Sequence, residues 1–173
     1  MSADETIKFR QNEEEKFMKI TTTTLAAQPF LNGMNKRQLE LLVENSMLAE
    51  FKTDERIATQ GGPANRFYLI LEGQVQLETP VMEGEAMRIQ ILGPGDVLGW
   101  SWLFPPYLWH FDARAVTPTK AIFFYGTRLR ELCEENHDLG YELMKRVSEI
   151  VIRRLQATRR ELVEHDKNLL LPM

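Results

Sequence analysis

The segment from Gly99 to Phe111, GWSWLFPPYLWHF, holds the residues of this sequence best suited to binding a ligand. A glycine that opens a tight turn can present backbone amides to an anion, and an imidazole such as that of His110 can donate or accept a hydrogen bond. Large aromatic rings offer flat faces for stacking. The segment could be a buried strand, a membrane-facing patch or a ligand pocket whose usual polar contacts have been replaced. We favour the pocket.

Enzymatic and metal chemistry have little support. Ser101 lies in GWSWL, which lacks the second glycine of a hydrolase nucleophile elbow, and no nucleophile has an identifiable base. His110, His137 and His165 are far apart in the sequence, and no cysteine cluster accompanies them, so we expect no metal ion. His110 is either a pH-sensitive or ligand-donating group, or a packed side chain with one satisfied nitrogen. The single cysteine, Cys133, is expected to be a small, partly buried thiol rather than a redox or nucleophilic group.

Composition limits the class of protein. The 173 residues are 43% hydrophobic and 27% charged with a formal net charge of −4, which is typical of one globular domain and unfavourable for nonspecific nucleic-acid binding. The N-terminus lacks the basic start and apolar run of a secretory signal, and no apolar stretch reaches the length of a membrane span. A cytoplasmic location without membrane association is the simplest expectation.

Periodicity predicts a mainly β fold with helices (α+β). Asn35 can cap a helix with apolar positions at Leu39, Leu42, Val43 and Met47. Short strands follow, separated by turn residues about ten positions apart, as in an antiparallel jelly roll or double-stranded β-helix. The expected strands are residues 55–59, 66–71, 74–79, 87–92, 96–100, 111–116 and 120–125. Residues 87–92, MRIQIL, alternate apolar and polar, which predicts one buried and one solvated face.

The chain closes with a short helix and then a long one, for which Asp138 is the expected cap and Asn168 the approximate end. Its apolar stripe runs from Leu139 to Leu162, and about 28 residues at 1.5 Å each would extend beyond a small β domain. We therefore predict a homodimer through residues 138–165; the alternative is that the helix folds back on its own sheet or N-terminal arm. The predicted parts are an arm (1–27), the jelly roll (28–136) and the long helix with its tail (137–173).

FYLILEGQV, LGPGDVLG and RRLQATRREL, in this order and spacing, resemble the cyclic-nucleotide-binding domain of the catabolite activator and fumarate-nitrate regulator family over about residues 28–168. The resemblance implies that residues 99–115 form the phosphate-binding cassette. In that family an acidic residue after the glycine accepts a hydrogen bond from the ribose, and an arginine further on pairs with the phosphate.

This sequence keeps the frame of the cassette but not its charges. Aligned on GDVLG, the acidic position is Trp100, the arginine position is His110 and the following hydroxyl position is Phe111. An indole cannot accept from a ribose hydroxyl, and a neutral imidazole replaces a bidentate cation poorly. The aromatic rings either fill the vacated pocket or line one suited to an apolar or flat ligand.

Two arginines outside these aligned positions, Arg159 and Arg114, could replace the missing phosphate-binding cation. Thr158 and Arg159 on the long helix match the family positions that touch the base, so Arg159 could supply a cation or could lie on a solvated face. Arg114 should share a face with Asp112, away from the pocket, because strand residues alternate. The expected ligand-site residues are Gly99, Trp100, Ser101, His110, Phe111, Thr158 and Arg159. We expect no catalytic residue. We also expect no cofactor other than the cyclic nucleotide that the family binds, and the residues that usually contact that nucleotide are missing here.

The function expected from these features is a small-molecule sensor or regulatory module of cyclic-nucleotide-binding type with a degenerate cassette. One alternative is a structural or interaction protein without a ligand, and another is a transcription regulator that lacks its DNA-binding domain. The helix from His137 to Asn168 carries seven Lys and Arg against six Asp and Glu, and the sequence ends before a helix-turn-helix segment. Direct DNA binding is therefore not expected.

Overall fold

The computed structural model describes residues 19–169 of the chain, with side chains omitted for residue 161 and residues 165–169. The described residues divide into two compact units, with the boundary between Leu129 and Arg130. The part of the predicted arm before residue 19 lies outside the described residues. None of the described helices is both long and apolar enough to cross a membrane.

The first unit opens with short helices that are capped by polar side chains. Helix α2 (Thr22–Ala26) begins after Thr21, and α3 (Lys36–Glu44) begins after Asn35, whose side chain accepts a hydrogen bond from the Gln38 amide at 3.0 Å. A 3₁₀ turn, η1 (Pro29–Leu31), lies between them. Helix α3 ends earlier than the apolar spacing predicts, because Met47 belongs to the strand that follows.

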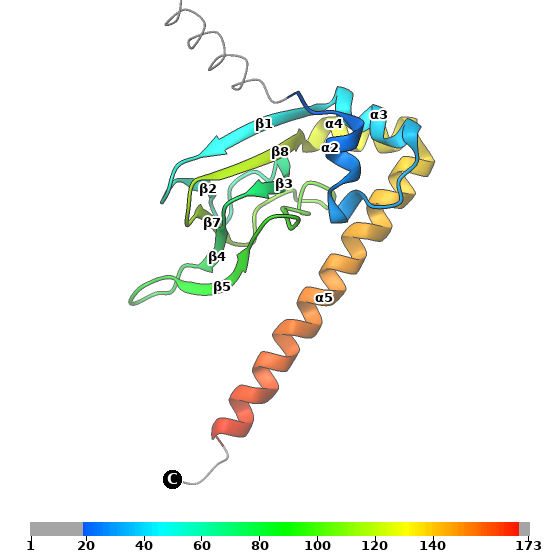
Figure 1. Cartoon of the computed structure of the whole chain (residues 1–173). Helices are drawn as coiled ribbons and strands as arrows, with labels where there is room; N and C mark the ends of the chain where they lie inside the picture. The colour runs from blue at the N-terminus through cyan, green and yellow to red at the C-terminus, as the bar shows by residue number, and fades with distance from the viewer. Residues whose placement is uncertain (1–18, 170–173) are drawn as a thin grey trace, which may run out of the picture. The chain divides into compact units, whose positions relative to one another are not determined.

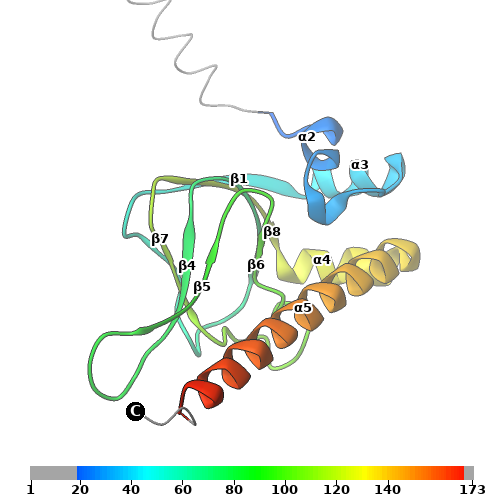
Figure 2. The same cartoon turned by 60° about the horizontal axis from the view of Figure 1, so that its bottom comes forward.

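Two antiparallel sheets of four strands make up the predicted roll. One has the order β1-β8-β3-β6 and the other β2-β7-β4-β5, and Figures 1 and 2 show them facing each other. The strands are β1 (Ser46–Phe51), β2 (Arg56–Ala58), β3 (Arg66–Glu72), β4 (Val75–Thr79), β5 (Met87–Leu92), β6 (Val97–Leu98), β7 (Asp112–Ala115) and β8 (Thr119–Tyr125). The architecture expected from the sequence is confirmed, although β1 was not predicted and β6 is much shorter than expected.

Strand β8 is central to the first sheet because both of its neighbours lie far from it in the sequence. Phe123 is paired with Met47 of β1 on one side and with Tyr68 of β3 on the other. Aromatic rings cover the outward face of this sheet. The centroid of the Phe67 ring lies 5.3 Å from that of Phe30 and 5.8 Å from that of Trp102. The inward face contributes Tyr68 and Phe123 to the core between the sheets.

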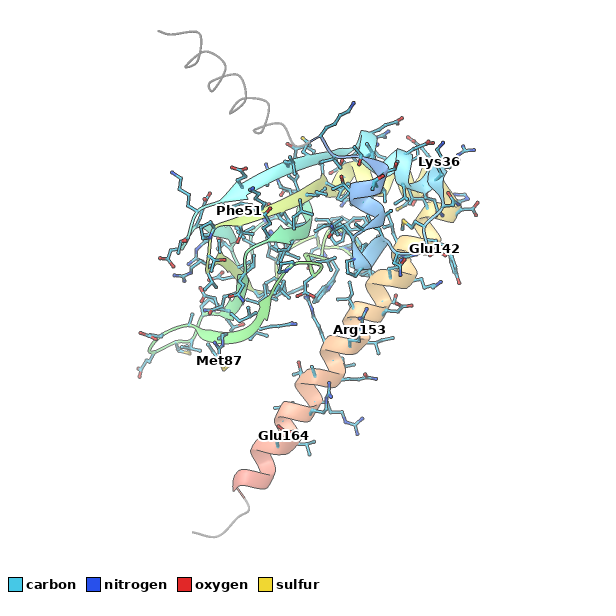
Figure 3. All side chains as sticks on the ribbon, in the orientation of Figure 1. Lys36, Phe51, Met87, Glu142, Arg153 and Glu164 are labelled. Carbon is cyan, nitrogen blue, oxygen red and sulfur yellow. The ribbon has the colours of Figure 1, made fainter. Side chains whose placement is uncertain are left out.

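Strand β5 is the edge of the second sheet and departs from the alternation predicted for it. Met87, Ile89 and Ile91 are all exposed, as are the polar residues between them, and only Leu92 is buried. The hairpin between β4 and β5 projects from the roll, and Figure 3 labels Met87 at its base. The prediction of one buried face for this strand was wrong, because an edge strand beyond the packed part of the sheet has nothing to cover it.

The second unit contains the end of α4 (Gly126–Glu135) and the long α5 (His137–Leu169). Helix α5 begins one residue before the expected cap, so Asp138 lies in its first turn. Its apolar residues differ in exposure along the helix: Leu139, Leu143 and Val147 are buried, whereas Leu155 is 67% and Leu162 64% exposed. In Figure 3 the labelled Arg153 and Glu164 mark this exposed part of the helix.

Candidate functional site

The cassette begins at Gly99, where only glycine fits. Its φ is +90°, and an added Cβ would lie 2.4 Å from Cη2 of Trp109 and 3.1 Å from the carbonyl oxygen of Arg66. Both the backbone conformation and the close approach exclude a side chain. The turn therefore brings the start of the cassette directly against the ring of Trp109 near its end.

Trp109 and Phe111 occupy the interior of the roll. They are 5% and 6% exposed, and they belong to the hydrophobic core together with Tyr68 and Phe123. The ring of Phe111 lies 6.0 Å from that of Trp109 and 6.2 Å from that of Trp100. Burying each ring contributes on the order of 2–3 kcal/mol, so these side chains stabilise the roll itself.

His110 and the other cassette residues lie in different environments. His110 is exposed between the buried Trp109 and Phe111, Ser101 is buried, and Trp100 is half-buried against the core. His110, which the sequence predicts at the arginine position, is thus exposed, and the ring of Trp100, predicted at the acidic position, packs against the core.

The later half of the cassette is hydrogen-bonded to residues 61–64 by its backbone. The Trp109 amide donates to Gly62 O at 2.9 Å, and the Gly61 amide donates to Trp109 O at 2.8 Å. The Ala64 amide donates to Tyr107 O at 2.7 Å. These three amides already have carbonyl acceptors, so they are not available to an anion in this conformation.

Arg114 faces away from the core, as alternation predicts. It forms an ion pair with Glu78, which also accepts from Gln76 Nε2 at 2.9 Å. Burial alone would raise the pKa of the Glu78 carboxyl, but the hydrogen bonds from Arg114 and Gln76 and the Arg114 charge together lower that pKa. Arg114 is therefore paired with a carboxylate on the outer face of the second sheet.

A second ion pair lies beside it. Arg56 Nη1 is 2.7 Å from Asp112 Oδ2, and the backbone amide of Gln60 donates to the other Asp112 oxygen at 2.7 Å. A surface cavity of about 460 Å³ adjoins the Arg114–Glu78 pair; it is lined by Asp54, Gln76, Glu78, Glu85, Ala86, Arg114 and Val116. The pairs join β2, β4 and β7 and do not contribute to the roll's interior.

Thr158 and Arg159 belong to the second unit and are exposed on α5. The expected site residues of the cassette therefore belong to the first unit, whereas Thr158 and Arg159 belong to the second unit. Among the side chains that the structure describes, no group of three or more His, Cys, Asp or Glu is arranged to hold a metal ion. The side chain of His165 lies outside that description.

Sequence reasoning missed Arg66, the first residue of β3. Its guanidinium carbon lies 4.7 Å from the ring centroid of Phe123 and 5.5 Å from that of Tyr125. The only available signal was a cation at the start of an otherwise apolar strand, RFYLIL. Strand pairing, which the sequence does not reveal, brings it beside the two rings.

A two-sheet roll with a glycine-started cassette is the arrangement of cyclic-nucleotide-binding domains. The family model for the cyclic nucleotide-binding domain matches residues 48–136, and the chain belongs to this family.

Bacterial proteins and a protozoan protein of similar fold match this chain. A putative cyclic nucleotide-binding protein of Geobacter metallireducens is 31% identical with a TM-score of 0.71, covering 79% of this chain and 98% of the other. The CRP-like cAMP-activated global transcriptional regulator of Mycobacterium tuberculosis is 22% identical over 81% of this chain, and the match spans 61% of that relative. The regulatory subunit of a cAMP-independent protein kinase A from Trypanosoma cruzi, bound to guanosine, has 24% identity and a TM-score of 0.58 over 65% of this chain and 39% of its own.

Proposed function

We propose that this chain is a small-molecule sensor or regulatory module whose cassette does not capture cyclic AMP or cyclic GMP in the usual way. The observation that carries the proposal is the position of Trp109 and Phe111, whose rings fill the interior while His110 points to solvent. Capture of a sugar phosphate needs a cation and a hydrogen-bond acceptor in the mouth of the roll. The cassette supplies aromatic groups at both places.

Calorimetric titration with cyclic AMP and cyclic GMP tests this part of the proposal. We expect no binding with a Kd below about 1 mM, since the ordinary affinity of a charge-assisted phosphate contact is missing. A Kd in the micromolar range or tighter for either nucleotide would overturn it. The double variant with Trp100→Glu and His110→Arg restores the family's charges and should increase the affinity for a cyclic nucleotide.

Helix α5 is the proposed dimer contact. Met144, Val151, Leu155 and Leu162 follow one another at intervals of seven, four and seven residues, which is the spacing of a coiled-coil seam. Met144, Leu155 and Leu162 are exposed, so this stripe lacks cover within the described chain. A second copy of α5 would provide it, and ligand-dependent changes would reach the partner through this helix.

We further propose that the protein regulates a partner without catalysing a reaction. It would act in the cytoplasm and would not contact DNA directly. The match to the mycobacterial regulator covers only part of that relative, so its activity as a transcription regulator is carried over only as an alternative. In that alternative the activity would require a DNA-binding segment joined to this domain.

A second candidate function is an interaction module that has no ligand. The exposed edge strand β5, with Met87, Ile89 and Ile91, favours it, because exposed apolar residues on an unpaired edge can pair with another chain. Native mass spectrometry of the purified protein separates the two candidates. A bound small molecule supports the sensor, whereas its absence, together with failure of all probes described below, supports the interaction module.

A further inference from the structure

Arg66 points toward the inner face of its sheet, at the mouth of the roll. It shares this face with Tyr68 and Ile70, the alternate residues of β3 that belong to the core. The guanidinium lies over the rings of Phe123 and Tyr125, and its charge lies close enough to the Tyr68 hydroxyl to lower the pKa of that group against the larger, opposite effect of burial. Arg66 itself is half-buried, so part of the guanidinium remains accessible.

Strand pairing places Arg66 next to the cassette. In the β3–β6 ladder Tyr68 pairs with Leu98, and the next residue, Gly99, lies beside the Arg66 backbone, where an added Cβ would be 3.1 Å from the Arg66 carbonyl oxygen. On its other side Arg66 is the cross-strand partner of Tyr125. Arg66 therefore lies between the first residue of the cassette and a tyrosine that is 44% exposed.

No carboxylate among the described side chains pairs with Arg66, whereas Arg56 and Arg114 each have one. Aromatic faces stabilise the positive charge of a guanidinium but accept few of its five N–H donors. The edge of the guanidinium can therefore still donate to an acceptor. An anion is the acceptor that a half-buried, unneutralised guanidinium binds most strongly.

We propose that Arg66 is the anion-binding residue of this mouth and that the ligand is a small planar molecule carrying a negatively charged group. The charged group would bind the open edge of the guanidinium, and the planar body would stack on the exposed ring of Tyr125. This inference rests on the proposed sensor function and deepens it, because it names the cation that the cassette lacks. Both a phosphate and a carboxylate have the required chemistry.

Matched pairs of charged and neutral probes test the proposal. The pairs are guanosine 5′-monophosphate with guanosine, for phosphate, and 2-naphthoate with 2-naphthol, for carboxylate. Calorimetry and tryptophan fluorescence report binding to the full chain. We expect at least one anionic probe to bind about 10- to 100-fold more tightly than its neutral counterpart, and whichever pair shows this identifies the anion.

Two substitutions of Arg66 and one matched control complete the design. Arg66→Gln should remove the preference for the charged probe, and Arg66→Lys should retain only part of it, since an ammonium lacks the planar fork. Arg88→Gln on the exposed strand β5 makes the same change of charge away from the mouth and should leave binding unchanged. Circular dichroism melts verify that each variant is folded; should Arg66→Gln fail to fold, Arg66→Lys and the probe pairs in the wild type still decide.

Each outcome separates this inference from the proposed function. Equal affinity for charged and neutral probes, or equal losses in Arg66→Gln and Arg88→Gln, would overturn the role of Arg66 and leave the sensor intact. Failure of all four probes would count against both. Micromolar binding of cyclic AMP that is lost in Arg66→Gln would support Arg66 and overturn the expected failure of cyclic-nucleotide capture.

Discussion

Gly99 and Trp109 are in direct contact across the cassette, where a Cβ on the glycine would come within 2.4 Å of the indole ring. The two ends of the cassette are therefore locked together by a contact that leaves no room for even one methyl group. The indole is also part of the core, so a change at Gly99 affects the interior of the roll directly.

Gly99→Ala should destabilise the protein by about 2–4 kcal/mol, because it combines an unfavourable φ with overpacking. Urea denaturation measures the change. The matched control is Gly93→Ala, at which an added Cβ meets nothing within 4 Å. If Trp109 is the clashing group, Trp109→Phe in the Gly99→Ala background should recover part of the loss. A Gly99→Ala variant as stable as Gly93→Ala would refute the contact.

The Glu78–Arg114 pair should make stability depend on acid pH. The pKa of the folded Glu78 carboxyl is lowered below its ordinary value of 4.5, so the unfolded chain binds the proton more readily. The stabilisation is complete above that value and is lost as the pH falls through the folded pKa. Denaturation curves between about pH 6 and pH 2.5 should show a decline that Glu78→Gln reduces.

Glu78→Gln should also lower the stability at pH 7 by about 1–3 kcal/mol, because Arg114 loses its charged partner. Glu50→Gln, at an exposed position, serves as the control and should change stability little. An acid profile of Glu78→Gln identical to that of the wild type would show that the carboxyl has no such role.

Cys133 should react slowly with thiol reagents. Burial, with a smaller contribution from the charge of Glu134, raises the pKa of its thiol from 9.0 to about 11. At pH 8 the reactive thiolate would be roughly 50- to 100-fold scarcer than in the unfolded chain. The rate of reaction with a disulfide reagent, with and without denaturant, measures this. Equal rates in both conditions would show a free, exposed thiol.

The exposed stripe of α5 should decide the oligomeric state. The 20.1 kDa chain is expected to sediment as a dimer, and Leu155→Glu should shift it toward the monomer, since a carboxylate in a coiled-coil seam is costly to desolvate. Gln156→Glu adds the same charge at the next position and should leave the dimer unchanged. A wild-type chain that sediments as a monomer at all accessible concentrations would contradict the proposed contact.

Local sequence signals determined much of the fold. Asn35 caps α3 as expected, and turn residues separate most strands where the sequence has them. These features could be predicted because capping, alternation and turn formation depend on a few neighbouring residues. Strand β1 was missed because Met47 continues the apolar spacing of α3, and only pairing with the distant β8 makes it a strand.

The candidate site shows the same division. The sequence by itself shows Trp100 and His110 in the predicted cassette and predicts that they stand where the family has an acid and an arginine. Only the tertiary structure decided that Trp109 and Phe111 fill the roll, that Arg114 is engaged by Glu78, and that Arg66 lies beside the cassette. The physical reason is that burial and charge pairing depend on which strands become neighbours, and these strands are separated by tens of residues in the chain.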